Sequence, residues 1–232
     1  MINNMEKLSI IIPIYNEKDT LLEILKRVEE SDTLGLQKEV ILVDDGSTDG
    51  TRGLLKGLEA KYTILYHQKN QGKGAALKTG FRKATGDIIL IQDADLENHP
   101  KEYPKLLKPI LENKAEVVYG SRHLIKNPRP SLKYYLGNKF TNILLNLAYG
   151  CHLTDLWTGY KVFKADVIKN INLESNRFDI EVEITAKLLR KKYKIMEVPI
   201  EYFPRSIEEG KKIRPKDGFI AIWKIIKYRF TA

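Results

Sequence analysis

The sequence predicts an α/β fold of the doubly wound type, with a mainly parallel sheet and helices on both of its faces. Hydrophobic runs of strand length alternate with amphipathic segments through the first half of the chain. The runs are rich in Ile and Val and apolar at nearly every position, which is typical of strands covered on both faces. A repeated order of strand, helix and strand indicates parallel strands joined by crossover helices.

The first half of the chain supplies five predicted strands and the helices between them. Strands are expected at residues 7–15, 38–45, 62–68, 87–93 and 115–120. Apolar residues recur at helical spacing in the intervening segments, which are residues 17–31, 49–62, 72–86 and 99–114. This alternation predicts one sheet with crossovers on both faces.

The second half departs from this alternation. A loop at 126–130 is expected to precede a helix at 131–150 that is long enough to pack along the sheet. A helix is predicted at 178–192 and a strand at 194–203. The chain then has a basic loop and an amphipathic helix, and residues 205–232 contribute +5 to the net charge of +9.

Composition limits the partners and the compartment. The chain has 232 residues, 43% of them hydrophobic, which is enough for one domain with a sizeable core. Its 39 Lys and Arg outnumber its 30 Asp and Glu, so we expect an anionic partner such as a nucleotide, a lipid headgroup or a nucleic acid. Cys151 is the only cysteine, which excludes intramolecular disulfides and fits a reducing compartment. We expect no signal peptide and no membrane span.

Polar residues stand at the end of each of the first four predicted strands. In doubly wound sheets, ligands bind beyond the carboxyl ends of the strands, so these residues mark the candidate site. They are Asn16 and Glu17, Asp44 and Asp45, Gln68 and Asn70, and Asp93 and Asp95.

The fourth strand runs into three carboxylates at alternate positions, Asp93, Asp95 and Glu97. Carboxylates this close raise one another's pKa or recruit a cation. Oxygen ligands alone favour Mg²⁺ or Mn²⁺, which is commonly shared between one or two carboxylates and a substrate diphosphate. The alternative is a solvated acidic turn before Pro100, and the position at a strand end favours the metal.

Two further stretches suit a nucleotide. Asp49 can cap a helix, but capping does not explain the tandem acids Asp44 and Asp45, which can accept hydrogen bonds from a base or a ribose. The Gly-rich stretch before Leu77 matches neither a Walker A loop nor a Rossmann fingerprint. It is either a helix start whose amides and Lys73 bind an anion, or a solvated helix start.

The basic C-terminal segment has three interpretations. It is a solvated loop, a nucleic-acid surface, or a surface for phosphate and membrane. Stacking aromatics and known DNA- or RNA-binding motifs are absent, so we expect no nucleic-acid partner. A basic loop followed by an amphipathic helix suits a phosphate and a membrane surface, although the helix can equally bury its apolar side chains against the domain. The dispersed His67, His99 and His152 receive no role.

Eight motifs in order carry a resemblance to a known family. They are IIPIYNE, VDDGSTDGT, NQGKGAALKTG, QDADLE, VYGSR, TDLWTGYKVF, VPIEYFPR and EEGKKIRPKDG. On these motifs the chain resembles family 2 glycosyltransferases of the GT-A fold, specifically the polyprenyl-phosphate (dolichyl-phosphate) hexosyltransferases. The resemblance implies a nucleotide-diphospho-sugar transferase domain at 1–204, with a donor half at 1–120 and an acceptor half at 121–204. The basic loop and helix at 205–232 are expected to belong to the same domain.

The resemblance also implies roles for individual residues. The nucleotide sugar is expected on Pro13, Tyr15, Glu17, Asp44, Asp45, Lys73, Gln92, Asp93 and Ala94. Asp93, Asp95 and Glu97 are expected to hold Mg²⁺ or Mn²⁺, although some relatives have Gln at the position of Glu97. Arg122, Arg205 and Lys211 are expected to face phosphates. Asp155 is expected to act with Asp95 in catalysis, as a base or as a group that orients the acceptor, and the alternative for Asp155 is a helix or turn cap.

The implied reaction transfers a hexose, with inversion, from GDP-mannose or UDP-glucose to a polyprenyl phosphate at the cytoplasmic face of a membrane. Negative charge builds on the leaving diphosphate, where a divalent ion and basic side chains stabilise it. A phosphate acceptor, with a second pKa of about 6, is already a nucleophile and needs positioning more than a strong base. Some relatives carry transmembrane helices after this domain. We expect surface contacts or a membrane-protein partner to bring the lipid here.

Four alternatives remain open at this point. A sugar hydroxyl is the other acceptor, and it would need a positioned base. Phosphoryl transfer through an Asp-x-Asp pair is disfavoured, because the pair follows the fourth strand rather than the first. A nucleotidyltransferase is disfavoured, because no Gly-rich, Arg-bearing loop follows the first strand. A non-catalytic nucleotide-sugar sensor would bind the donor without turnover.

Overall fold

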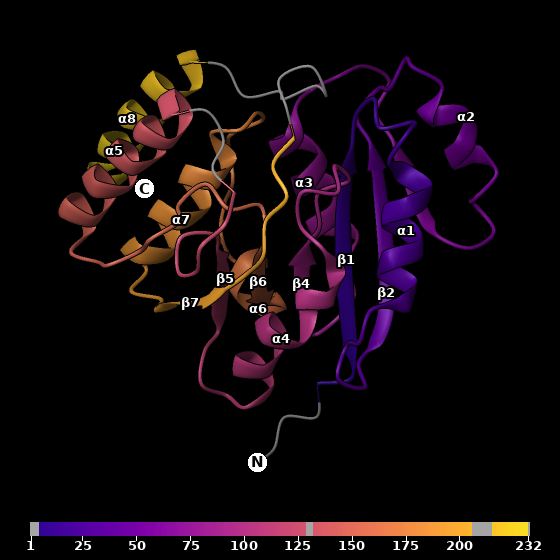
Figure 1. Cartoon of the computed structure of the whole chain (residues 1–232), viewed down its shortest axis with the longest axis horizontal. Coiled ribbons are helices and arrows are strands. Elements are labelled where there is room, and N and C mark those ends of the chain that lie inside the picture. The colour runs from indigo at the N-terminus through magenta and orange to yellow at the C-terminus, as the bar shows by residue number, and fades with distance from the viewer. Residues whose placement is uncertain (1–4, 129–131, 206–214, 232) are drawn as a thin grey trace.

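A seven-stranded sheet runs through the middle of the protein, with helices on both faces (Figure 1). The structure is a computed structural model that describes residues 5–128, 132–205 and 215–231. The strands are β1 (Lys7–Ile14), β2 (Gln37–Asp44), β3 (Thr63–Tyr66), β4 (Ile88–Ile91), β5 (Val117–Ser121), β6 (Lys161–Lys164) and β7 (Ile195–Pro199). Their order is β3-β2-β1-β4-β6-β5-β7. The predicted α/β class is therefore confirmed.

The sheet is mainly parallel, as predicted. β1 pairs in parallel with β2 and β4, so that Ile10 lies between Val40 and Leu90. β6 is the exception, because it is antiparallel to both of its neighbours, β4 and β5. The sequence predicts no element at residues 154–163, which contain all of β6 except Lys164, because the apolar run of β6 is too short to stand out from the turn before it.

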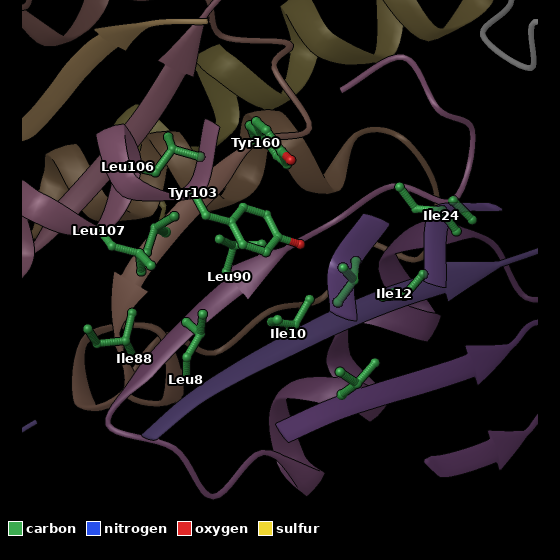
Figure 2. Close-up of a cluster of buried hydrophobic side chains, with 14 of the residues drawn as sticks. Leu8, Ile10, Ile12, Ile24, Ile88, Leu90, Tyr103, Leu106, Leu107 and Tyr160 are labelled. Carbon is green, nitrogen blue, oxygen red and sulfur yellow. The ribbon is translucent and has the colours of Figure 1, made fainter. Parts of the chain in front are cut away.

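Alternate residues of the central strands face opposite helical layers, because successive side chains of a strand point to opposite faces. Figure 2 shows Leu8, Ile10 and Ile12 of β1 on one face, in a cluster that also includes Ile24 and Tyr103. Ile11, between them in the chain, belongs to the cluster on the other face. Each fully buried side chain of this kind contributes about 1.5–3 kcal/mol.

The helices divide between the two faces. α1 (Leu21–Glu30), α2 (Thr51–Lys56) and α4 (Tyr103–Leu111), which follows a 3-10 turn at Pro100–Glu102, cover the face drawn in Figure 2. α3 (Lys73–Lys83), α6 (Ala165–Lys169) and α7 (Ile180–Arg190) cover the other. α2 is shorter than the helix predicted at 49–62, because Gly53 and Gly57 weaken the segment.

Two long helices form an outer layer beyond α7 (Figure 1). α5 (Leu132–Tyr149) and α8 (Pro215–Phe230) share a cluster with α7 that includes Leu145, Val182 and Ile225. The helix predicted at 131–150 is confirmed as α5, but the expectation that it packs along the sheet is wrong, since it packs on α7 and α8. Among the described residues, no helix combines the length and the hydrophobicity needed to cross a membrane.

Candidate functional site

The turn after β4 carries two acids of the predicted site, Asp93 and Asp95. The Lys73 ammonium, at the start of α3, lies 2.7 Å from Asp93 Oδ1 and 3.0 Å from Glu181 Oε1 of α7. Gly159 passes close to this pair, and a Cβ there would overlap with the Asp93 carboxylate. Lys73, predicted to bind an anion of the donor, is therefore held between two protein carboxylates in this structure.

The buried side chain of Gln92 holds this turn in place through hydrogen bonds. Its amide nitrogen donates to the carbonyl oxygens of Asp93 and Asn98, at 2.9 and 3.2 Å. Its amide oxygen accepts hydrogen bonds from the hydroxyls of Tyr103 and Tyr160, at 3.0 and 2.7 Å. The side chain is fully buried, and its hydrogen bonds are made inside the protein. In this structure the Gln92 side chain therefore positions the acidic turn, and the prediction that this residue also contacts the donor stays a prediction.

Ala94 lies in the same turn, and its predicted donor contact stays a prediction. Its methyl group is buried in the cluster of Figure 2 rather than turned toward the edge of the sheet. Asp95, the next residue, lies half-buried at that edge and accepts a hydrogen bond from the backbone amide of Glu97, at 3.1 Å. The alternation of side chains along the turn thus leaves Asp93 and Asp95 outward and Ala94 inward.

The electrostatics of Asp95 suit a cation. Burial, and then the negative charges of Asp93 and Glu97, raise the pKa of Asp95 to about 7. A divalent ion on the two aspartates would favour the ionised carboxylate and so offset this shift, and carboxylate oxygens are ligands that Mg²⁺ and Mn²⁺ prefer. The residues present therefore fit such an ion.

Glu97 does not complete a three-carboxylate set. Its carboxylate accepts hydrogen bonds from the Tyr202 hydroxyl, at 2.9 Å, and from the backbone amide of Arg205, at 3.0 Å. No group of three or more His, Cys, Asp or Glu in the described ranges has the geometry to hold a metal. The predicted set of Asp93, Asp95 and Glu97 is corrected to two aspartates, a number that Mg²⁺ commonly supplements with water and substrate phosphate.

The tandem acids after β2 have different surroundings. Asp44 is fully buried, and its carboxylate lies 2.6 Å from the Arg52 guanidinium and accepts from the backbone amide of Ser47 at 3.0 Å. Asp44 therefore stabilises the turn after its strand, and the prediction that it also binds the donor stays a prediction.

Asp45 supports the start of α3. Its carboxylate accepts hydrogen bonds from the backbone amides of Gln71 and Gly72, at 2.9 and 2.7 Å. The His67 ring lies between Asp45 Oδ1, at 2.7 Å, and Thr79 Oγ1, at 3.0 Å, so this histidine has a structural role that we did not expect. The prediction that Asp45 also meets a nucleotide stays a prediction.

Arg205 connects the ends of β1 and β4. Its guanidinium lies 2.8 Å from Glu17 Oε2 and donates to the backbone carbonyl of Asp95 at 2.6 Å. Pro13 and Tyr15 are half-buried at the same edge. The phosphate role of Arg205 and the donor roles of Pro13, Tyr15 and Glu17 remain predictions, and Lys211 lies outside the described residues.

Arg122 and Asp155 form a buried ion pair. Two guanidinium nitrogens of Arg122, Nε and one terminal nitrogen, donate to the two oxygens of Asp155 at 2.7 Å each, and the Arg122 amide donates to Asp155 at 3.0 Å. Burial acts to raise the pKa of Asp155, but the charge and hydrogen bonds of Arg122 outweigh it and hold that pKa below its usual range. Asp155 is therefore a weak base without access to water, and the geometry favours the orienting role over the base.

A cavity of about 140 Å³ opens beside this pair. Its lining includes Arg122, Lys126, Asn127, Tyr135, Asn138 and Tyr202. The Arg122 guanidinium stacks on the Tyr202 ring, 4.9 Å from its centre, and the Tyr202 hydroxyl reaches Glu97. A continuous set of contacts thus joins the acidic turn after β4 to the basic cavity after β5.

The sequence did not lead us to three charged residues under the site. Glu181 forms buried ion pairs with Lys161 and Lys73. Glu197 accepts hydrogen bonds from the backbone amides of Thr154 and Asp155, at 2.8 and 2.9 Å, and so fixes the chain that carries Asp155. The available signal in the sequence was the presence of acids within otherwise apolar segments. The structure shows that every residue from 180 to 188 is buried.

Comparison with known proteins adds three findings. A model of the family described as glycosyl transferase family 2 matches residues 9–171. A dolichol-phosphate mannosyltransferase of Pyrococcus furiosus is 31% identical over 88% of this chain and 59% of its own length. An undecaprenyl-phosphate 4-deoxy-4-formamido-L-arabinose transferase of Klebsiella pneumoniae is 30% identical over 89% of this chain and 63% of its own length. The chain thus spans about three fifths of these two relatives.

Solved structures give the fold. The glucosyl-3-phosphoglycerate synthase of Mycobacterium tuberculosis, in complex with Mn²⁺, uridine diphosphate and phosphoglyceric acid, superposes with a TM-score of 0.76. The superposition covers 98% of this chain and 80% of that chain, at 18% sequence identity. The same enzyme is also known in complex with Mg²⁺ and uridine diphosphate. The likeness confirms the predicted GT-A fold.

Proposed function

The chain belongs to glycosyl transferase family 2, and we propose that it transfers a hexose from a nucleotide-diphosphate sugar to a polyprenyl phosphate at a membrane surface. The observation that carries this proposal is the continuity of two unlike sites. The acidic turn of Asp93 and Asp95 suits the metal-bound diphosphate of a donor. The Arg122 cavity, joined to that turn through Tyr202 and Glu97, suits the phosphate of an acceptor.

Asp93 and Asp95 would hold the divalent ion. The ion, when bound, supplies Lewis-acid stabilisation of charge on the departing diphosphate. Arg205 lies beside Asp95 and can add positive charge there, although its ion pair with Glu17 must then be shared. Gln92 and Gly159 contribute by holding the acidic turn in place and by leaving room for the Asp93 carboxylate.

The state of Asp155 supports a phosphate acceptor over a sugar hydroxyl. A hydroxyl acceptor requires a base near the reacting oxygen. Asp155 is buried, paired with Arg122, and has a lowered pKa. A phosphate monoester is already anionic near neutral pH, so an arginine that is fixed in position by a carboxylate serves it better. The two polyprenyl-phosphate transferases among the relatives support the same acceptor class.

The test is a transfer assay with separated donors. Purified protein is incubated with Mn²⁺, a polyprenyl phosphate, and either UDP-glucose or GDP-mannose, with and without EDTA. We expect a glycosylated lipid from one donor, and its loss with EDTA. Nucleotide release without lipid product would favour a sugar-hydroxyl acceptor, whereas donor binding without any turnover would favour a nucleotide-sugar sensor.

Asp155→Asn is expected to raise the acceptor KM by about tenfold while kcat changes less, because the neutral amide no longer fixes the Arg122 guanidinium. Steady-state kinetics with varied polyprenyl phosphate measure both constants. Asp32→Asn, on an exposed carboxylate before β2, is the control and should leave them unchanged. A loss of kcat on the order of 10³ with an unchanged acceptor KM would instead give Asp155 the role of base.

A further inference from the structure

The outer surfaces of α5 and α8 carry large apolar side chains that face solvent. They are Leu136, Phe140, Ile143 and Leu147 of α5, and Phe219, Trp223, Ile226 and Phe230 of α8, each 50–79% exposed. We call these eight residues the α5/α8 face. Within each helix the spacing is four, three and four residues, which places the four side chains on one side.

The four exposed apolar side chains of each helix form a stripe, and the two stripes face the same side of the molecule. The opposite sides of the helices bury Leu145 of α5 and Ala221 and Ile225 of α8 in one cluster, together with Val182 of α7. Figure 1 shows α5 and α8 side by side at the edge of the molecule farthest from α1 and α2. The α5/α8 face therefore gathers eight large exposed apolar side chains on one surface, and contiguous apolar surface of this kind marks an interaction site.

The charges around this face identify the kind of partner. α5 contains no Asp or Glu, and α8 contains none after Asp217. Lys139 and Arg229 are exposed on these helices, while Lys227 is paired with Glu174 at 3.2 Å. Apolar side chains combined with unbalanced positive charge are typical of helices that lie in the interface of an anionic bilayer. In a symmetric dimer through the same face, the cations of one copy would meet those of the other.

The face adjoins the proposed acceptor cavity. Tyr135 and Asn138, at the beginning of α5, line the cavity that contains Arg122, and Leu136 between them begins the stripe. Ile125 lines the same cavity and is partly exposed. A lipid phosphate in the cavity would thus have an apolar surface beside it.

We propose that the α5/α8 face docks on an anionic lipid bilayer and that docking brings the Arg122 cavity to the level of the headgroups. The assignment of the cavity rests on the proposed function, but docking is measurable without any sugar transfer. Each aromatic side chain that enters the interface contributes on the order of a tenfold change in partition.

The test is sedimentation of the full chain with phosphatidylcholine vesicles, with or without phosphatidylglycerol. We expect binding that is tighter to the anionic vesicles. Phe140→Ser with Trp223→Ser should weaken this binding roughly a hundredfold, at about tenfold for each aromatic. Leu22→Ser is the matched control, because Leu22 is 55% exposed like Leu136 but belongs to α1, which lies on the far side of the molecule from α5 and α8 (Figure 1). It should bind as the unchanged protein does.

Three results would overturn the proposal. The first is an unchanged protein that stays in the supernatant with every vesicle. The second is an equal loss of binding in the Leu22→Ser control. The third is a dimer in sedimentation equilibrium that Phe140→Ser with Trp223→Ser dissociates, without vesicle binding, which would assign the face to a second copy of the chain.

A second assay separates this proposal from the proposed function. With a short, water-soluble prenyl phosphate as acceptor, the double variant should keep its transfer rate, while transfer to vesicle-embedded polyprenyl phosphate falls. Vesicle binding without transfer to either acceptor would support docking and reject the proposed function. Transfer to the soluble acceptor without vesicle binding would support the function and reject docking.

Discussion

Asp95→Asn is expected to lower the rate of sugar transfer on the order of 10³ and, at the same time, to stabilise the metal-free protein at pH 8. The amide keeps the oxygen that accepts the hydrogen bond from the Glu97 amide, so the turn after β4 is retained. It loses the negative charge that a divalent ion requires. Initial rates with saturating donor and acceptor, at several Mn²⁺ concentrations, measure the first effect.

The stability gain follows from the sign of the pKa shift. Burial and the charges of Asp93 and Glu97 raise the pKa of Asp95 from its ordinary value of 3.8 to about 7. The folded state therefore disfavours the ionised carboxylate, and stability is lost as the pH rises from about 4 through 7. Asparagine has no such penalty. We expect the free energy of unfolding of the variant to exceed that of the unchanged protein by about 1–3 kcal/mol at pH 8 in EDTA, and to match it below pH 4.

Asp87→Asn provides the control for this pair of effects. Asp87 precedes the same strand, β4, at its other end, where its carboxylate accepts from the backbone amides of Glu6 and Lys7. We expect normal turnover from this variant. Unchanged activity in Asp95→Asn would contradict the metal assignment, and a variant that is both inactive and less stable at pH 8 would indicate that Asp95 serves the fold instead.

Glu181→Ala is expected to destabilise the protein by about 3–5 kcal/mol, because it leaves the fully buried Lys161 ammonium without its carboxylate. Burial already lowers the pKa of Lys161, which shows how unfavourable its charge is at this position. Two backbone carbonyls, of Leu156 and Thr158, remain as acceptors for it. Urea unfolding at neutral pH, followed by tryptophan fluorescence, measures the loss.

The double variant Lys161→Met with Glu181→Leu tests the physical cause. Apolar side chains of similar size remove the buried charge along with its partner, so a large part of the lost stability should return. Lys73 keeps its ion pair with Asp93 in both variants. If the double variant were no more stable than Glu181→Ala, lost packing rather than an uncompensated charge would be the cause.

Much of the fold was readable from the sequence, because strands and helices leave local patterns. The Ile- and Val-rich runs that became β1, β2 and β4 need only their neighbours in sequence to be recognised. β6 was missed because it has four residues, too few for a periodicity to show. The acidic turn at Asp93 and Asp95 was also recognisable, since strand order alone places it at the carboxyl edge.

The states of the site residues were not readable in this way. Asp155 and Arg122 are 33 residues apart, and Arg205 meets Glu17 across 188 residues. The sequence predicts that each of these side chains is available to a substrate. In the structure, each of them has a charged partner within the protein. Gln92 was in the right motif but has its side chain below the turn, in hydrogen bonds with Tyr103 and Tyr160.

The sequence by itself determined the α/β order, the position of the acidic turn and the amphipathic character of the C-terminal helix. Only the tertiary structure decided that Asp155 is paired with Arg122, that Glu97 holds the segment before residue 206, and that α5 and α8 present their apolar stripes on one side. The physical reason is that periodicity records which side chains avoid water. The protonation and availability of a charged group depend on which distant partner lies within hydrogen-bond distance once water is excluded.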